Sequence, residues 1–180
     1  MIKSIIIFIL LFTFDNALMV FFPLQSLLGG YIVVPYLVLI GVCLHPFFDD
    51  EKNHAFWLAI FFGLIYDMFG ANLIGFYATI FPILVVTIKK RIVATTPVNF
   101  ISIFYIVTVA ITIIELILYV LAIFILGRTV SILDFVQHRL VATVVFNGLL
   151  LALFYLPLVK LLQPKIEKKV KTIMTDNTLA

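Results

Sequence analysis

The sequence predicts an all-α integral membrane protein with six transmembrane helices, and three observations carry that prediction. Hydrophobic residues make up 64% of the chain and charged residues 12%, about half the share that is usual in soluble domains. The mean hydropathy of +1.27 is too high for a soluble fold of this length. The apolar residues also form long runs that charged or turn-forming segments separate. Lipid is therefore the expected solvent of a multi-pass protein.

Six apolar runs define the spans of a single transmembrane domain over residues 1–163, and a basic tail, 164–180, follows it. The predicted spans are about 4–22, 31–47, 55–69, 73–88, 98–126 and 140–162. The first run resembles a signal peptide. However, it is longer than a usual signal sequence, contains Asp15 and Asn16, and has no small-residue cleavage site after it. We therefore interpret it as a retained helix.

The third and fourth runs must be two helices rather than one. A single helix over 55–88 would have 34 residues and a length of about 51 Å, against a hydrocarbon core of about 30 Å. The turn-forming residues Gly70, Ala71 and Asn72 supply the break, so we expect a tight hairpin. Kinks are expected inside three spans, at Pro35, Pro82 and Pro157.

The positions of Lys and Arg predict that both termini are cytoplasmic. With six spans, this orientation leaves ten of these residues inside and only Arg128 and Arg139 outside. The basic tail should bind the anionic inner leaflet or an acidic cytoplasmic partner, or else act only as a topological anchor. The membrane-surface basic residues are Lys89, Lys90, Arg91, Lys165, Lys168, Lys169 and Lys171.

Ionisable residues inside the spans predict an intramembrane polar network, because a charge at mid-span costs roughly 2.5–3.5 kcal/mol even on the gentler insertion scales. Asp15, beside Asn16, is expected to face a neighbouring helix. The fifth span carries a polar stripe at helical spacings, formed by Tyr105, Thr108, Thr112, Glu115 and Tyr119. The sixth span carries a shorter one, formed by Arg139, Thr143 and Asn147.

Depth along the spans places Asp67, Glu115 and Arg139 in the outer half of the bilayer. We hypothesise that these three side chains approach one another, with the arginine compensating one acid. Alternatively, Arg139 snorkels to the membrane boundary and Asp67 reaches the outer headgroups from a helix end.

The glycines around Asp67 predict a close contact with another helix. Gly63 and Gly70 lie seven residues apart on the helix face that carries Asp67, and Gly75 follows the expected turn. Small residues let membrane helices approach closely, so we favour helix packing as the role of this face. If a partner binds, this face or the adjoining outer surface is where we expect it.

No motif of a catalytic or metal site is present in the sequence. It lacks a Gly-rich phosphate loop, H-E-x-x-H and G-x-S-x-G, and the single Cys43 cannot form a disulfide within the chain. We therefore expect neither enzymatic activity nor a cofactor. Nucleic-acid binding is not expected either, because the positive charges cluster beside the spans.

The run Gly63-Leu64-Ile65-Tyr66-Asp67, followed by Gly70, Leu73 and Gly75, resembles the signature region of the rod shape-determining protein MreD family. The length, the six-span profile and the Lys-rich C-terminus are also similar. The resemblance implies a non-catalytic component of the elongation machinery in the bacterial plasma membrane. It implies association with the single-span protein MreC and, through it, with MreB filaments and peptidoglycan synthases.

The family is also similar in fold to the six-helix S components of energy-coupling-factor vitamin transporters, and such a subunit is the alternative function. An S component would use the outer-half polar residues to bind a vitamin. Its usual Ala-x-x-x-Ala docking motif is missing from the first span, which contains only Ala17.

Overall fold

The computed structural model describes residues 2–21, 30–48, 53–69, 75–93, 95–125, 127 and 131–163, and these residues form a helical bundle without strands. The first four helices are α1 (Ile2–Phe21), α3 (Leu37–Leu44), α4 (His54–Phe69) and α5 (Phe76–Thr87), with a 3-10 turn η1 (His45–Phe47) extending α3 and a π-helical turn η2 (Ile88–Ile92) extending α5. The long helix α6 (Phe100–Phe124) follows. The last helix is continuous through α7 (Ile132–Phe135), η3 (Val136–Leu140) and α8 (Val141–Leu162).

Three of the helices are long and apolar enough to cross a membrane. They cover Ile2–Val20, Phe100–Phe124 and Ile132–Leu162, with mean hydropathies of 1.9, 2.7 and 2.1. The helices α4 and α5 are shorter, at 16 and 12 residues, and lie where the sequence predicts the two arms of a hairpin. The bundle is therefore that of a membrane protein in which three shorter helices, α3, α4 and α5, lie in sequence between the first long helix and the last two.

The prediction of a single helix over 31–47 is wrong in its first third. Residues 31–36 are extended, and the α-helix begins only at Leu37. Pro35 causes the difference, since proline has no N–H to donate and disfavours helical backbone in the residue before it. Instead of kinking a helix, Pro35 ends an extended segment two residues before α3 begins.

The sixth helix begins earlier than the predicted residue 140. Ser131 caps it, because its Oγ accepts a hydrogen bond from the Leu133 amide at 3.3 Å, and the helix then continues without interruption past His138 and Arg139. Residues 132–139, which the sequence predicts to lie before the sixth span, are thus helical, and residues 136–140 form a turn of the π type.

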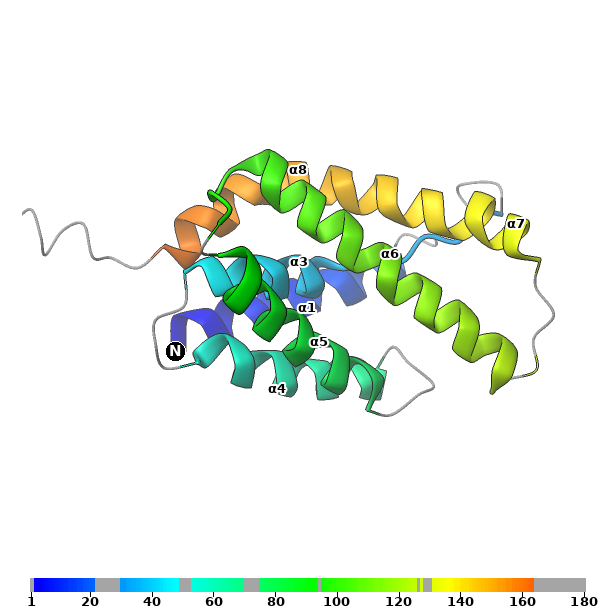
Figure 1. The fold of residues 1–180 in the computed structure, drawn as a ribbon, viewed down its shortest axis with the longest axis horizontal. Coiled ribbons are helices and arrows are strands. Elements are labelled where there is room, and N and C mark those ends of the chain that lie inside the picture. Colours follow the sequence, from blue (N-terminus) through cyan, green and yellow to red (C-terminus); the bar gives the residue numbers. More distant parts are fainter. Residues whose placement is uncertain are drawn as a thin grey trace, which may run out of the picture.

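The short helix α3 forms the centre of the bundle. All eight of its residues, from Leu37 to Leu44, are buried, and α1, α5, α6 and α8 contact it (Figure 1). Its sequence contains no charged residue, so the helix can be enclosed on every side at no electrostatic cost. Because its N-terminus is enclosed as well, its free backbone amides must find partners inside the protein.

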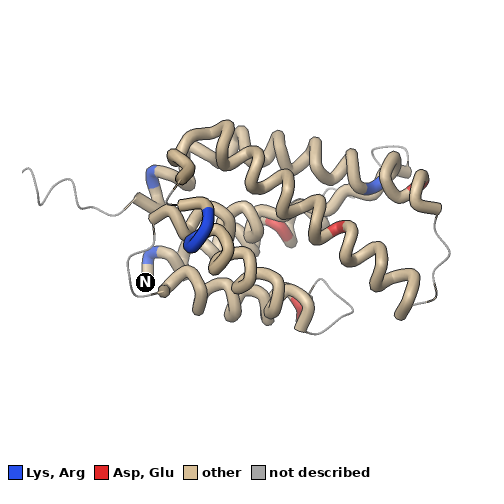
Figure 2. The backbone as a smooth tube through the Cα atoms, viewed as in Figure 1, with Lys and Arg blue, Asp and Glu red and all other residues tan. Residues whose placement is uncertain are grey.

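The two ends of the bundle differ in charge. Lys and Arg gather at the end where the N-terminus lies, on the start of α1, on η2 and near the end of α8 (Figure 2). Arg139 belongs to η3, which follows α7, and α7 lies at the opposite end (Figure 1). The polar residues of the interior lie between these two ends.

Candidate functional site

A row of polar groups on the last helix binds the backbone of the extended segment. The amide of Ile32 donates to the carbonyl of His138 at 2.8 Å. Two residues on, the amide of Val34 donates to Thr143 Oγ1 at 3.4 Å, and that hydroxyl lies 3.4 Å from the carbonyl of Ile32. This row therefore replaces the hydrogen bonds that a helix would have made over this stretch.

Asn147 makes the shortest of these contacts. Its Oδ1 accepts from the Tyr36 amide at 2.7 Å, and its Nδ2 donates to the Val34 carbonyl at 2.7 Å. The repeat lengths match, because two extended residues advance about 6.6 Å and four helical residues about 6 Å. Thr143 and Asn147, four apart, can thus serve Val34 and Tyr36, two apart. This is the structural role of the polar stripe on the sixth span.

Asp15 of α1 caps the buried N-terminus of α3. Its Oδ1 accepts from the Leu37 amide at 2.8 Å, and its Oδ2 accepts from the Val38 amide at 3.1 Å. The hydroxyl of Tyr66 also donates to Oδ2, at 2.9 Å, and lies 3.2 Å from the carbonyl of Pro35. The helix dipole and these donors together stabilise a carboxylate that is only 2% exposed.

Asp67 of α4 caps α5 in the same way. It accepts from the amides of Gly75, Tyr77 and Ala78 at 2.9, 2.8 and 3.1 Å. Gly75, with φ of 94°, adopts the left-handed conformation that glycine tolerates best, and this turns its N–H toward the carboxylate. Because Asp67 is 2% exposed, the alternative in which it reaches the outer headgroups is wrong.

Gly63 allows α4 and α5 to pack closely enough for this cap. A Cβ at position 63 would lie 2.6 Å from the carbonyl oxygen of Tyr77 and 2.7 Å from the Cα of Ala78. No real side chain fits at such distances from backbone atoms. The glycine-bearing face of α4 therefore packs inside the chain, and Gly63 and Asp67 are not available to a partner.

Glu115 and Arg139 form a salt bridge between α6 and the last helix. Arg139 Nε donates to Glu115 Oε2 at 2.7 Å, and its Nη2 lies 3.5 Å from Oε1. The hydroxyl of Tyr36 donates to Oε1 at 2.8 Å and lies 3.3 Å from that of Tyr77. Glu115 is fully buried, so the guanidinium supplies the compensating charge that its position requires.

Three residues that the sequence places with this network do not join it. Thr112 donates to the carbonyl of Thr108 on its own helix at 2.8 Å, and Tyr105, on the same stripe, is 70% exposed. Asp67 does not join Glu115 and Arg139, because its carboxylate is bound by the α5 amides. Helical spacing alone could not reveal that only one edge of the stripe faces the protein.

Three tyrosines belong to the polar core although the sequence pattern did not indicate that role for them. Tyr36, Tyr66 and Tyr77 are all buried, and each places its hydroxyl on a carboxylate or on another of the three hydroxyls. Their positions in the sequence were the available signal. Tyr36 follows Pro35, Tyr66 precedes Asp67, and Tyr77 lies two residues after Gly75.

Several predicted residues lie elsewhere. Gly70 and the tail with Lys165, Lys168, Lys169 and Lys171 are outside the described residues. Lys89, Lys90 and Arg91 form η2 at the basic end of the bundle, and Lys89 Nζ donates to Asn53 Oδ1 at 3.3 Å.

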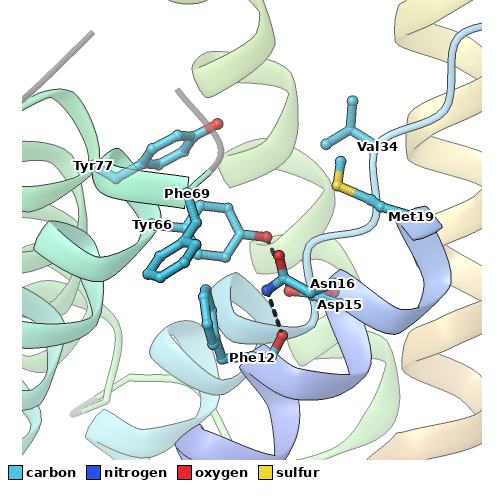
Figure 3. Close-up of a pocket in the computed structure, with 8 residues that line it drawn as sticks. All are labelled: Phe12, Asp15, Asn16, Met19, Val34, Tyr66, Phe69 and Tyr77. Atoms are coloured by element: carbon cyan, nitrogen blue, oxygen red, sulfur yellow. Dashed lines mark hydrogen bonds between the residues drawn. The ribbon is translucent and has the colours of Figure 1, made fainter. Parts of the chain in front are cut away.

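A small cavity adjoins Asp15 between α1, the segment that precedes α3, the end of α4 and the start of α5. It has a volume of about 50 Å³ and is lined by Phe12, Asp15, Asn16, Met19, Val34, Tyr66, Phe69 and Tyr77. Figure 3 shows the Tyr66 hydroxyl directed at Asp15, with Met19 and Val34 on one side and Phe69 and Tyr77 on the other. Polar groups thus form its floor, and apolar groups form much of its wall.

The family model of the rod shape-determining protein MreD matches residues 1–165. The chain belongs to the MreD family. No curated protein and no solved structure matches it.

In this member of the MreD family, the signature region holds α4 and α5 together. Gly63 admits α5, Asp67 caps it, and Gly75 turns the chain into the cap. Tyr66 also connects α4 to α1, because its hydroxyl donates a hydrogen bond to Asp15. The motif therefore maintains the fold from within.

Proposed function

We propose that this chain is a non-catalytic subunit of the bacterial rod complex and controls cell shape as a membrane scaffold. The observation that carries the proposal is the match of the MreD family model to residues 1–165, which is nearly the whole chain. Membership in that family implies a role in rod shape determination.

The geometry of the interior supports a scaffold rather than a catalyst. Asp15 and Asp67 accept hydrogen bonds from backbone amides, and Glu115 is paired with Arg139. Groups that act as acids or nucleophiles need a reacting atom within reach, whereas these carboxylates already face protein donors. Their arrangement suits a rigid body that presents fixed outer surfaces to partners.

The partner that we propose is an MreC-like single-span membrane protein, which would connect the chain indirectly to MreB filaments and peptidoglycan synthases. We further propose a multi-pass topology in the plasma membrane with both termini cytoplasmic. The gathering of Lys and Arg at one end of the bundle supports it, because basic residues are retained on the cytoplasmic side (Figure 2). That end would also bind anionic lipids.

The alternative function, a vitamin-binding S component, predicts a ligand site of a different size. Sites for small organic molecules enclose roughly 300–1,000 Å³. The cavity beside Asp15 has only about 50 Å³ and cannot hold a vitamin. The fold similarity to S components stays a prediction.

Affinity purification of the tagged chain from its native membranes tests the proposal. We expect co-purification of a single-span membrane protein with a large extracytoplasmic domain, and loss of rod shape on depletion of the chain. Recovery of a stoichiometric small organic molecule without any such partner would contradict the proposal and favour the S component. The exposed α8 variant Leu153→Ala is a suitable control, because it should leave both results unchanged.

A further inference from the structure

The cavity beside Asp15 offers hydrogen-bond acceptors in excess of donors. A carboxylate has about four acceptor positions, and that of Asp15 uses three, for Leu37, Val38 and Tyr66. Asn16 Nδ2 donates to the Phe12 carbonyl at 2.8 Å, whereas no contact to Asn16 Oδ1 is found among the described residues. Both of these side chains line the cavity.

The two tyrosines on the cavity wall add further acceptors. Tyr66 uses its hydrogen on Asp15. Tyr36 uses its hydrogen on Glu115, so Tyr77 must be the donor in the contact between the Tyr36 and Tyr77 hydroxyls. The oxygens of Tyr66 and Tyr77 are thus left as acceptors, and both residues line the cavity.

The charge of the cavity is also one-sided. Asp15 is the one ionisable acid among the eight lining residues, and no Lys, Arg or His is among them. Glu115, by contrast, has Arg139 at 2.7 Å. Helix α3 offers Asp15 two amides and a dipole, but no full positive charge. The cavity therefore suits an occupant that donates hydrogen bonds and carries positive charge.

The volume of the cavity and the residues at its opening limit which groups it can hold. A water molecule needs about 10–15 Å³ of such volume, so a cavity of about 50 Å³ admits one terminal ammonium group or a few waters. Met19 and Phe69, at 47% and 71% exposure, form its rim at the outer ends of α1 and α4. An apolar rim around an acidic floor matches a membrane helix that carries one basic side chain.

We propose that this cavity is the docking point for the membrane-spanning helix of the partner, which inserts a basic side chain against Asp15. This inference rests on the proposed function, because it assigns the surface at which the single-span partner binds. The helix would lie between α1 and α4, with its apolar face on Met19 and Phe69 and its ammonium group among the acceptors of Asp15, Asn16 and the two tyrosines.

A substitution that fills the cavity with the chain's own ammonium group tests the proposal. Position 19 lies four residues after Asp15, on the same face of α1, and lysine is similar to methionine in length. In Met19→Lys, we expect partner recovery from native membranes to fall roughly tenfold or more, the effect of losing a charged hydrogen bond. The thermal midpoint of the purified chain should rise. Val20→Lys is the matched control, because it adds the same charge at a neighbouring exposed position that does not line the cavity, and we expect it to keep both values near those of the unaltered chain.

A photo-crosslinking amino acid at position 69, on the rim, provides a second measurement that leaves Asp15, Asn16 and the two tyrosines unchanged. We expect an adduct with the single-span partner from position 69 and none from position 153, an exposed position on α8. Equal partner loss in Met19→Lys and Val20→Lys, unchanged recovery in Met19→Lys, or adducts with lipid alone would each overturn the inference. If the unaltered chain recovers no such partner at all, the proposed function fails instead.

Discussion

The helices α3 and α5 both begin inside the bundle, and each is capped by an aspartate from another helix. Asp67 caps α5 from within the same hairpin, 8 to 11 residues away in sequence. Asp15 caps α3 from a separate helix, 22 and 23 residues away. The extended segment before α3 depends in addition on Asn147, 111 residues away. One start is thus held locally, and the other is held by the tertiary fold.

The difference between these two caps indicates where a membrane helix can be interrupted. In lipid, every backbone group must find a partner within the protein, so a break needs a set of polar side chains at the same depth. Close in sequence, one carboxylate and one glycine suffice, as at Asp67 and Gly75. A break held at long range needs groups from two further helices. The pair Glu115–Arg139 then links both starts, because Tyr36 and Tyr77 adjoin it.

The largest loss of stability is expected at the Glu115–Arg139 pair, which adjoins the starts of both α3 and α5. Arg139→Met leaves the fully buried Glu115 without its cation, and we expect a loss of about 3 kcal/mol in the free energy of unfolding. The double variant Glu115→Leu with Arg139→Met should recover most of that loss. Denaturant titration in mixed micelles measures both. A double variant as unstable as the single one would show that the ion pair does not explain the stability.

The next largest loss of stability should come from a substitution that affects the start of α3 but not the start of α5. Asn147→Leu leaves the Tyr36 amide and the Val34 carbonyl unpaired, which should cost about 2–3 kcal/mol. Asn16→Leu is the matched control, since it removes only a bond within one turn of α1. The same titration compares them. Equal losses for the two asparagines would contradict the assigned role of Asn147.

Substitutions of Asp67, which caps the start of α5, should lower the free energy of unfolding by a smaller amount, and the loss should depend on whether the new side chain can accept a hydrogen bond. Asp67→Ala removes all three acceptor contacts and should cost about 2 kcal/mol, whereas Asp67→Asn keeps an acceptor and should cost less than about 1 kcal/mol. If Asp67→Asn were as damaging as Asp67→Ala, charge rather than capping would be the function of this residue.

The smallest effect is expected at the link between the hairpin and α1. Tyr66→Phe removes one hydroxyl from Asp15 and keeps the ring, so we expect a loss of about 1 kcal/mol. Tyr155→Phe, on the half-buried side of α8, is the control. Thermal unfolding followed by circular dichroism measures the difference, and identical midpoints for all three proteins would count against the link.

The sequence predicts the separate helices α4 and α5 well, because the length limit, the acid and the glycines lie within a short stretch, whereas the predicted turn at residues 70–72 lies outside the described residues. It does not predict the unwound segment before α3. Pro35 marks a break there, but hydropathy treats 31–47 as one run, and the partners Asp15, Thr143 and Asn147 are far away in the chain. The stripes on the fifth and sixth spans predict that polar groups face inward. What they cannot predict is which backbone they serve, since that depends on the packing of α8 along residues 32–36.

Side chains of α1 and α8, together with the His138 carbonyl, hold the backbone of residues 32–38 in place of helical hydrogen bonds. Amide hydrogen exchange by mass spectrometry, in the unaltered chain and in Asn147→Leu, tests this claim most directly. We expect faster exchange in peptides covering 32–38 of the variant, with unchanged exchange across 58–81. Unchanged exchange over 32–38 would contradict the claim, because amides within a continuous helix over 31–47 would not depend on Asn147.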